Sequence, residues 1–183
     1  MATVKVEIPW ERYGTIAYIV ESVKTCGKTA LQKFVYFLQE WKHVPLGYNF
    51  EFYTYGPFSA ELMGDLDFSD SLRAVQVKSV AAGGYWIGVG ERSKEIKDRA
   101  EDFLAEYKTA IDDVISVFGG SSAVSLELLA TTHYAFTYFR AQKGENDDEQ
   151  VIQAVHALKP GKFTTEQISK AINFLKEKSV LAS

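Results

Sequence analysis

The chain has little of what enzymes and metal proteins use for chemistry. It contains one cysteine, Cys26, so no disulfide can form within the chain, and a lone thiol fits a reducing compartment. The three histidines, His43, His133 and His156, are nowhere three or four residues apart, and CxxC, HExxH, GxGxxG and P-loop motifs are missing. We therefore expect no zinc site, no nucleotide site and no cofactor, and we expect Cys26 to be an inert buried thiol.

Long hydrophobic runs and a basic surplus are also missing. No stretch approaches the ~18 apolar residues that span a bilayer, and the opening MATVKVEIPW alternates instead of forming a signal-peptide core. We expect a cytoplasmic protein without a membrane segment. Residues 1–99 hold 12 Lys+Arg and 12 Asp+Glu, and residues 100–183 hold 8 and 12, which disfavours nucleic acid as a partner.

What the chain does have is an ordinary globular composition and many aromatic side chains. Its 183 residues are 46% hydrophobic and 24% charged, enough for a sizeable core without disulfides or metals. Aromatic residues make up 14%, and ten of them lie between Phe34 and Phe58. This uneven distribution marks that segment as core or as a contact surface.

Apolar periodicity and turn residues predict a mainly helical α+β fold. In order, the pattern predicts a strand at Thr3–Ile8, helices at Trp10–Val23 and Lys28–Lys42, a strand at Phe50–Tyr55, a helix from Gly56-Pro57 to about Leu66, a β-hairpin over Ala74–Gly90, and helices at Ser93–Phe118, Val124–Gln142, Asp148–Leu158 and from a capping box at Thr164–Gln167 to about Lys178. A helical trio followed by a two-stranded wing is typical of a winged helix. We thus expect a winged-helix-like unit with a small β-hairpin wing at residues 1–92 and a helical unit at residues 93–183, packed as one globular body.

Three stretches carry a family resemblance: Gly27–Glu40 (GKTALQKFVYFLQE), Tyr53–Leu66 (YTYGPFSAELMGDL) and Leu126–Tyr134 (LELLATTHY). Together with the closing LKPGKFTTEQISKAINFLKEKSVL, they resemble the YwgA-like proteins of bacteria and archaea over most of the chain. The first two stretches are similar, more distantly, to the Panacea (SocA-like) antitoxin domain. The first resemblance implies a fold without an activity, and the second implies a protein partner, typically a toxin or a protease adaptor. Neither carries catalytic residues over to this chain.

The aromatic segment offers one candidate contact surface. Along an alternating strand, half of the side chains face the core, so tyrosines such as Tyr53 and Tyr55 are expected outside, and Trp86 near the hairpin tip is expected to join them. Tyrosine and tryptophan suit protein contacts because their rings bury much area at low entropic cost. The same rings could stack single-stranded bases, but the nearby basic track is short.

One carboxylate stands out because Glu127 lies in VSLELLATTHYAF, a helix that is apolar nearly all round. A buried carboxylate must be paired, hydrogen-bonded or protonated. Lys33, Lys28 or a tyrosine hydroxyl are the partners that the sequence suggests. We interpret Glu127 as a buried polar link between the two halves; the alternative is a general acid of an uncharacterised enzyme.

DNA binding is the remaining alternative, since winged helices often bind DNA. The predicted third helix is acidic, however, and its carboxylates would repel phosphates. A DNA-binding regulator would have to use the last helix, through Lys170, Asn173 and Lys176, although Glu166 four residues before Lys170 is typical of a solvated face. Our interpretation is a non-enzymatic regulatory or interaction module, antitoxin-like or adaptor-like, that binds another protein. Self-association as a homo-oligomer is compatible with it.

Overall fold

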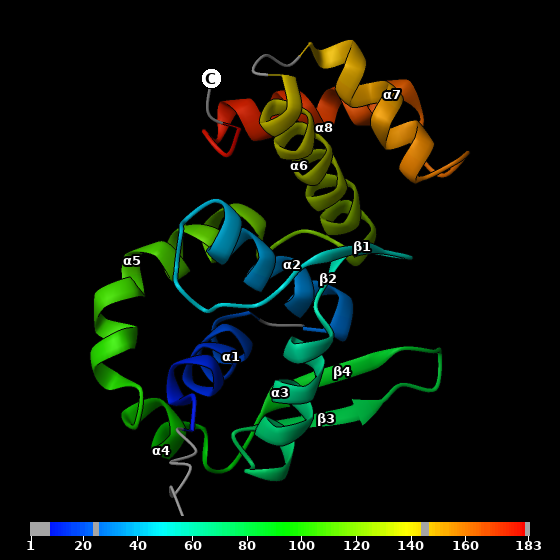
Figure 1. Cartoon of the computed structure of the whole chain (residues 1–183). Coiled ribbons are helices and arrows are strands. Elements are labelled where there is room, and N and C mark those ends of the chain that lie inside the picture. Colours follow the sequence, from blue (N-terminus) through cyan, green and yellow to red (C-terminus); the bar gives the residue numbers. More distant parts are fainter. Residues whose placement is uncertain (1–7, 24–25, 144–146, 182–183) are drawn as a thin grey trace, which may run out of the picture.

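The computed structural model describes residues 8–23, 26–143 and 147–181, and the predicted strand at Thr3–Ile8 lies outside this part except for Ile8. Within it the chain is a mainly helical α+β protein with eight helices and two small antiparallel hairpins (Figure 1). In order, the elements are α1 (Trp10–Ser22), α2 (Lys28–Glu40), β1 (Glu51–Tyr53), β2 (Gly56–Phe58), α3 (Ala60–Ser71), β3 (Val75–Ser79), β4 (Tyr85–Val89), α4 (Ser93–Asp98), α5 (Glu101–Phe118), α6 (Ala123–Lys143), α7 (Asp148–Leu158) and α8 (Thr165–Glu177).

The helix α2 lies at the centre of the packing. Every residue from Leu31 to Leu38 is buried, because α2 is enclosed by α1, α5, α6 and β2. Its Phe37 ring stacks on Phe118 of α5 with ring centroids 4.0 Å apart. One cluster of buried apolar residues therefore runs from α1 and α2 through α5 and α6 to α8. The division at residue 92 remains a prediction.

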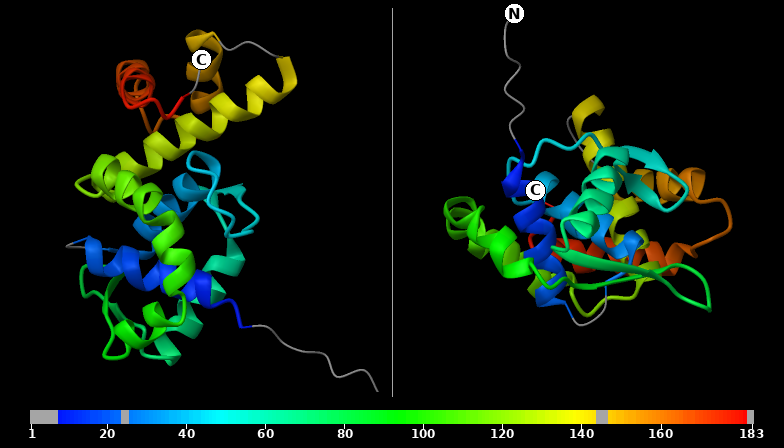
Figure 2. Two further views of the ribbon diagram at one scale, coloured as in Figure 1. Left: turned by 90° about the vertical axis from the view of Figure 1, so that its left-hand side faces the viewer. Right: turned by 90° about the horizontal axis from the view of Figure 1, so that it is seen from below.

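The helices α6, α7 and α8 pack on one another and form the upper part of the molecule in Figure 1, with α6 reaching down to α2 and β2 (Figures 1 and 2). At the start of α8 the predicted capping box is confirmed, since Thr164 and Gln167 each accept a hydrogen bond from the other's backbone N–H. No single helix in the described residues is long and apolar enough to cross a membrane. The helix α5 and residues 123–140 of α6 reach the required length and hydropathy only when taken together, and the chain bends by 116° between the two helices.

The predicted strand at Phe50–Tyr55 is confirmed in its central part as β1, but a second strand, β2, follows it and displaces the start of α3. The strands β1 and β2 pair antiparallel, with Phe52 opposite Pro57 and Tyr53 opposite Gly56. Gly56 adopts φ +83°, which turns the chain where the sequence suggested a helix start. Pro57 is tolerated because a two-stranded sheet leaves an outer edge, and its carbonyl points away to Lys33.

The third helix therefore begins at Ala60, four residues after Gly56, with Ser59 as its N-cap. Gln32 of α2 fixes this start, because its side-chain amide donates to the Ser59 carbonyl and accepts from the Ser59 N–H at 2.8 and 2.9 Å. The helix then continues to Ser71, five residues beyond the predicted end. Here a buried, tertiary hydrogen-bond pair outweighed the local helix-start signal of the Gly-Pro pair.

The predicted helix at Ser93–Phe118 is broken into α4 and α5 around Arg99 and Ala100. The break allows both pieces to pack on α1. At this point the backbones come close: a Cβ added to Gly14 of α1 would lie 2.5 Å from the Ala100 Cβ. The predicted hairpin at Ala74–Gly90 is confirmed as β3–β4, with positive φ at Gly83 and Gly84 in its turn.

Candidate binding groove

A groove of about 490 Å³ lies between the two hairpins, over the N-terminal half of α2 and the start of α3. Both hairpins extend to the same side of the molecule (Figure 1). Aromatic rings and lysines line this aromatic groove, chiefly Lys28, Lys33, Tyr53, Tyr55, Phe58 and Tyr85. Its size is that of a typical small-ligand or peptide pocket.

The rings at the rim of the aromatic groove are largely exposed. Tyr53, Tyr55 and Tyr85 expose 64%, 56% and 50% of their surface. Tyr53 packs against Phe58 with ring centroids 5.6 Å apart, so the hairpin presents a continuous aromatic face. Large apolar rings that remain half exposed in a folded chain mark a surface that gains from being covered.

The structure places two of the three predicted contact residues in the aromatic groove. Tyr53 and Tyr55 line it, whereas Trp86 does not, and Tyr85 occupies the position expected for Trp86. Successive strand residues point to opposite faces, so Tyr85 and Trp86 of β4 diverge. The Trp86 ring instead covers Gly88, where an added Cβ would lie 2.0 Å from the ring. This alternation would have identified Tyr85 as the contact residue if the sequence had shown which face of β4 lies towards α2 and the β1–β2 hairpin.

At the floor of the aromatic groove, Lys33 is only 1% exposed. Its ammonium donates a hydrogen bond to the Pro57 carbonyl oxygen at 2.6 Å. Burial lowers the pKa of Lys33 to about 7; the Glu127 charge opposes this shift and the Lys159 charge adds to it. An anion placed in the groove would favour the charged form of this lysine.

Behind the hairpin, Glu127 is a buried ion-pair partner, with a side chain 3% exposed. Lys162 Nζ donates to both Glu127 carboxylate oxygens at 2.8 Å, and Lys159 Nζ lies 2.8 Å from Oε1. The suggested direct pairing of Glu127 with Lys33 is therefore not what the structure shows, because Lys33 is bonded to Pro57 and acts on Glu127 only through its charge. No local pattern points to Lys159 and Lys162, which lie in the loop between α7 and α8, far along the chain from Glu127.

We refer to Lys33, Glu127, Lys159 and Lys162 as the lysine–glutamate cluster. Its lysines hold the β1–β2 hairpin at two carbonyls, since Lys159 also donates to Thr54 O and Lys33 donates to Pro57 O. The Lys162 ammonium lies 5.4 Å from the centre of the Tyr55 ring. The cluster therefore anchors the segment that presents Tyr53 and Tyr55 to the groove.

The predicted nucleic-acid residues of α8 do not form a basic surface. Lys170 Nζ lies 2.6 Å from Glu166, and Lys176 Nζ contacts both carboxylate oxygens of Asp148 at 2.7 Å. Asn173 is exposed between them. With both lysines paired within the chain, α8 offers phosphates little unbalanced positive charge.

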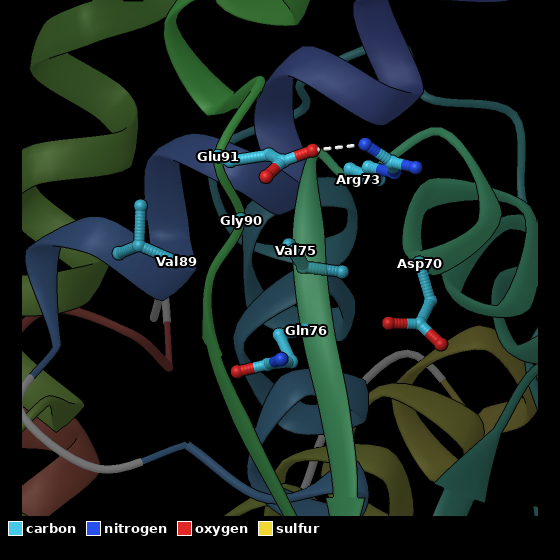
Figure 3. Close-up of a pocket in the computed structure, with 7 residues that line it drawn as sticks. All are labelled: Asp70, Arg73, Val75, Gln76, Val89, Gly90 and Glu91. Atoms are coloured by element: carbon cyan, nitrogen blue, oxygen red, sulfur yellow. Dashed lines mark hydrogen bonds and ion pairs between the residues drawn. The ribbon is translucent and has the colours of Figure 1, made fainter.

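Further hollows lie outside the aromatic groove. One of about 740 Å³ lies at the base of β3–β4, where Arg73 pairs with Glu91 (Figure 3). Asp70, which also lines it, accepts a hydrogen bond from the Val77 N–H. The charged groups of this hollow are thus engaged in contacts that stabilise the β3–β4 hairpin. Another, of about 380 Å³, is an apolar groove between Phe52, α6 and α7, with Tyr134 and Tyr138 in its wall.

The thiol of Cys26 and the imidazole of His133 are both buried. Among residues 8–23, 26–143 and 147–181, no group of three or more His, Cys, Asp and Glu side chains is arranged to hold a metal ion. Burial raises the pKa of the Cys26 thiol to about 12, which keeps it protonated. Burial also lowers the pKa of His133 to about 4, and its Nδ1 lies 2.9 Å from the Tyr36 hydroxyl.

Comparison with known proteins identifies one distant homologue and no matching family model. The chain is 26% identical over 160 residues to the uncharacterized protein YwgA of Bacillus subtilis (strain 168), which covers 86% of this chain and 89% of that protein. The predicted resemblance to YwgA is thereby confirmed. The name of that protein states no activity, and the more distant resemblance to the Panacea domain stays a prediction.

Proposed function

We propose that this homologue of YwgA is a non-enzymatic interaction module that binds another protein through the aromatic groove. The observation that carries the proposal is the set of half-exposed rings, Tyr53, Tyr55 and Tyr85, converging from two hairpins on one hollow. Covering such rings contributes much of the free energy in protein interfaces. The distant resemblance to an antitoxin domain supports the same class of function.

The scaffold of this module is winged-helix-like in our proposal. The helices α1, α2 and α3 precede the β3–β4 hairpin, and α1 contacts α2, α3 and both strands of that hairpin. In place of a groove-reading basic helix, α3 carries Glu61, Asp65, Asp67 and Asp70. The wing is used to build one wall of the aromatic groove, through Gly84 and Tyr85.

The two alternative functions draw no support from the geometry. Around Lys170 and Lys176, the carboxylates of Glu166 and Asp148 balance the positive charge, so α8 presents duplex DNA with little net positive charge. An enzyme built on Glu127 would require this carboxylate to be accessible, yet it is 3% exposed, is engaged by two lysines and does not line the aromatic groove.

Site-specific photo-crosslinking in the native cell tests the proposal. A benzophenone side chain is introduced at Tyr85 in the aromatic groove or, as the matched control, at Val124, which is 58% exposed at the start of α6. We expect a discrete protein adduct from position 85 that resists nuclease and disappears in a Tyr53→Ser/Tyr55→Ser background. Adducts that form equally at both positions, or that nuclease removes, would contradict the proposal.

A further inference from the structure

The chemistry of the aromatic groove also restricts what can occupy it. Positive charge gathers beneath and beside the β1–β2 hairpin: Lys33, Lys159 and Lys162 surround a single carboxylate, that of Glu127. Lys33 and Lys159 are 1% and 5% exposed, so water screens their charges poorly. Lys159 and Lys162 against Glu127 leave a net charge of +1, which rises to +2 when Lys33, whose pKa is about 7, is protonated. Of these residues Lys33 lies at the groove floor, where an anion would favour its charged form.

A second positive charge lies at the accessible side of the groove. The Lys28 ammonium is 4.2 Å from the centre of the Tyr85 ring, and its nearest carboxylate is that of Asp67 at 3.8 Å. Asp67 is 71% exposed, so this ion pair is weak and easily exchanged. Lys28 can thus turn to an incoming carboxylate without leaving a buried group unpaired.

We propose that the segment received by the aromatic groove is an extended acidic peptide of a partner protein, with an Asp or Glu side chain at Lys28 and apolar or aromatic neighbours against Tyr53, Tyr55 and Tyr85. This inference rests on the proposed function. The carboxylate replaces the exposed Asp67 as the partner of Lys28 and adds negative charge to a groove whose floor carries Lys33, and the rings bury the flanking side chains. Charge-assisted hydrogen bonds of this kind are the stronger ones, which gives the site a preference for acid over amide.

A peptide fits better than a single-stranded nucleic acid, which is also anionic and could stack on tyrosines. The helix α3 borders the groove at Met63 and carries Glu61 and Asp67 on its exposed surface. Successive phosphates would run into these carboxylates, whereas a peptide needs to present only one or two charges. Single-strand binders use a continuous basic groove along the backbone, and α3 interrupts it here.

Selection from a phage-displayed library of random 12-residue peptides tests the inference. The immobilised full chain is used for selection, and the Tyr53→Ser/Tyr55→Ser variant removes peptides that bind elsewhere. Enriched peptides are then synthesised with a fluorophore and titrated by anisotropy. We expect Asp or Glu next to apolar residues in the enriched set, and about tenfold weaker binding when that acid is replaced by its amide.

The Lys28→Gln variant should weaken binding of the acidic peptide by the same ~10-fold and leave binding of the amide peptide unchanged, because the two changes remove one contact. Lys94→Gln is the matched control, since Lys94 is 86% exposed on α4 and pairs only locally with Asp98. Melting curves of both variants show that they fold.

Three outcomes would overturn the inference, and they differ in what they leave standing. Enriched peptides without acidic residues, or affinity unchanged by Lys28→Gln, refute the acidic occupant and leave the interaction module intact. Failure to enrich any peptide that depends on Tyr53 and Tyr55 refutes the proposed function as well. Displacement of the peptide by a 12-nucleotide oligothymidylate at equal concentration would assign the groove to nucleic acid instead.

Discussion

Replacing Glu127 by glutamine should destabilise the protein far more than a change of one atom suggests. The carboxylate is 3% exposed and is the partner of Lys159, itself 5% exposed, and of Lys162. An amide keeps the shape and one acceptor but removes the negative charge. Lys159 would then be a buried cation without a counter-ion, and the nearby Lys33 adds further positive charge whenever it is protonated.

The expected magnitude follows from the cost of an unpaired buried charge. Breaking a buried ion pair by neutralising one partner costs about 3–5 kcal/mol in free energy of unfolding. For a chain of this length, each kcal/mol shifts the melting temperature by about 2–4 °C, so we expect a loss of roughly 10 °C. Part of the loss reflects weaker anchoring of the hairpin at Thr54 and Pro57.

Differential scanning calorimetry and urea titration measure this effect. The matched control is Glu166→Gln, which breaks the Lys170–Glu166 pair at 2.6 Å on an exposed face, 74% and 77% exposed, and should shift the melting temperature by less than about 2 °C. Adding Lys159→Met to Glu127→Gln should recover part of the loss, because it removes the stranded cation. A Glu127→Gln variant that melts within about 2 °C of the parent would refute the reasoning.

Two further predictions concern the buried core beside this cluster. Because the pKa of His133 is lowered to about 4 from 6.5, the unfolded chain binds more protons at this histidine between these pH values. The contribution of His133 to the free energy of unfolding should therefore fall by up to ~3 kcal/mol as pH drops through this window and stay constant above it. Urea titrations at pH 4.5 and 7.5 check this, and a His133→Leu variant that keeps the full loss would contradict it. Gly56→Ala should destabilise the hairpin by more than 1 kcal/mol, since φ is +83° there and the new Cβ would lie 2.9 Å from Thr131 Oγ1; Gly83→Ala, with positive φ but open space, is the comparison, and equal melting temperatures would refute the steric part of the argument.

The elements that the sequence predicts well are those whose signals are local. The helix α7 matches its predicted bounds because an apolar stripe lies between a polar start and a polar loop. The capping box before α8 and the Gly-Gly turn of β3–β4 depend on residues within four positions of each other. The interactions that form such elements lie within the segment itself, so its sequence pattern is sufficient to predict them.

The predictions that were wrong depended on contacts between distant residues. Gly56-Pro57 became a strand because Lys33 takes up the Pro57 carbonyl and Gln32 fixes Ser59 as the helix start. The long helix broke because both of its pieces pack on α1. In each case a generic local preference was worth less than a buried hydrogen bond or a core contact.

The candidate site shows the same limit at the level of single side chains. The buried position of Glu127 follows from its apolar helix, and its need for a cation follows from electrostatics. The path of the α7–α8 loop in the fold determines which lysines pair with Glu127. This loop brings Lys159 and Lys162 to the carboxylate, and Lys33 does not pair with it directly. Likewise, the exposed tyrosines could be predicted from the sequence. Predicting that Tyr85, and not Trp86, faces the aromatic groove requires knowledge of how β4 pairs with β3.

The lysine–glutamate cluster and the aromatic groove are physically linked by the β1–β2 hairpin. Lys33 and Lys159 hold the carbonyls of Pro57 and Thr54, so Tyr55 between them is presented in a fixed position before any partner arrives. Preorganisation of this kind lowers the entropic cost of binding. Glu127→Gln should therefore reduce peptide affinity together with thermal stability, whereas Lys28→Gln should reduce affinity alone. If affinity survived in Glu127→Gln at a temperature where the variant is folded, the hairpin would be held by its own pairing and by β2 packing on α6, and the cluster would serve stability only.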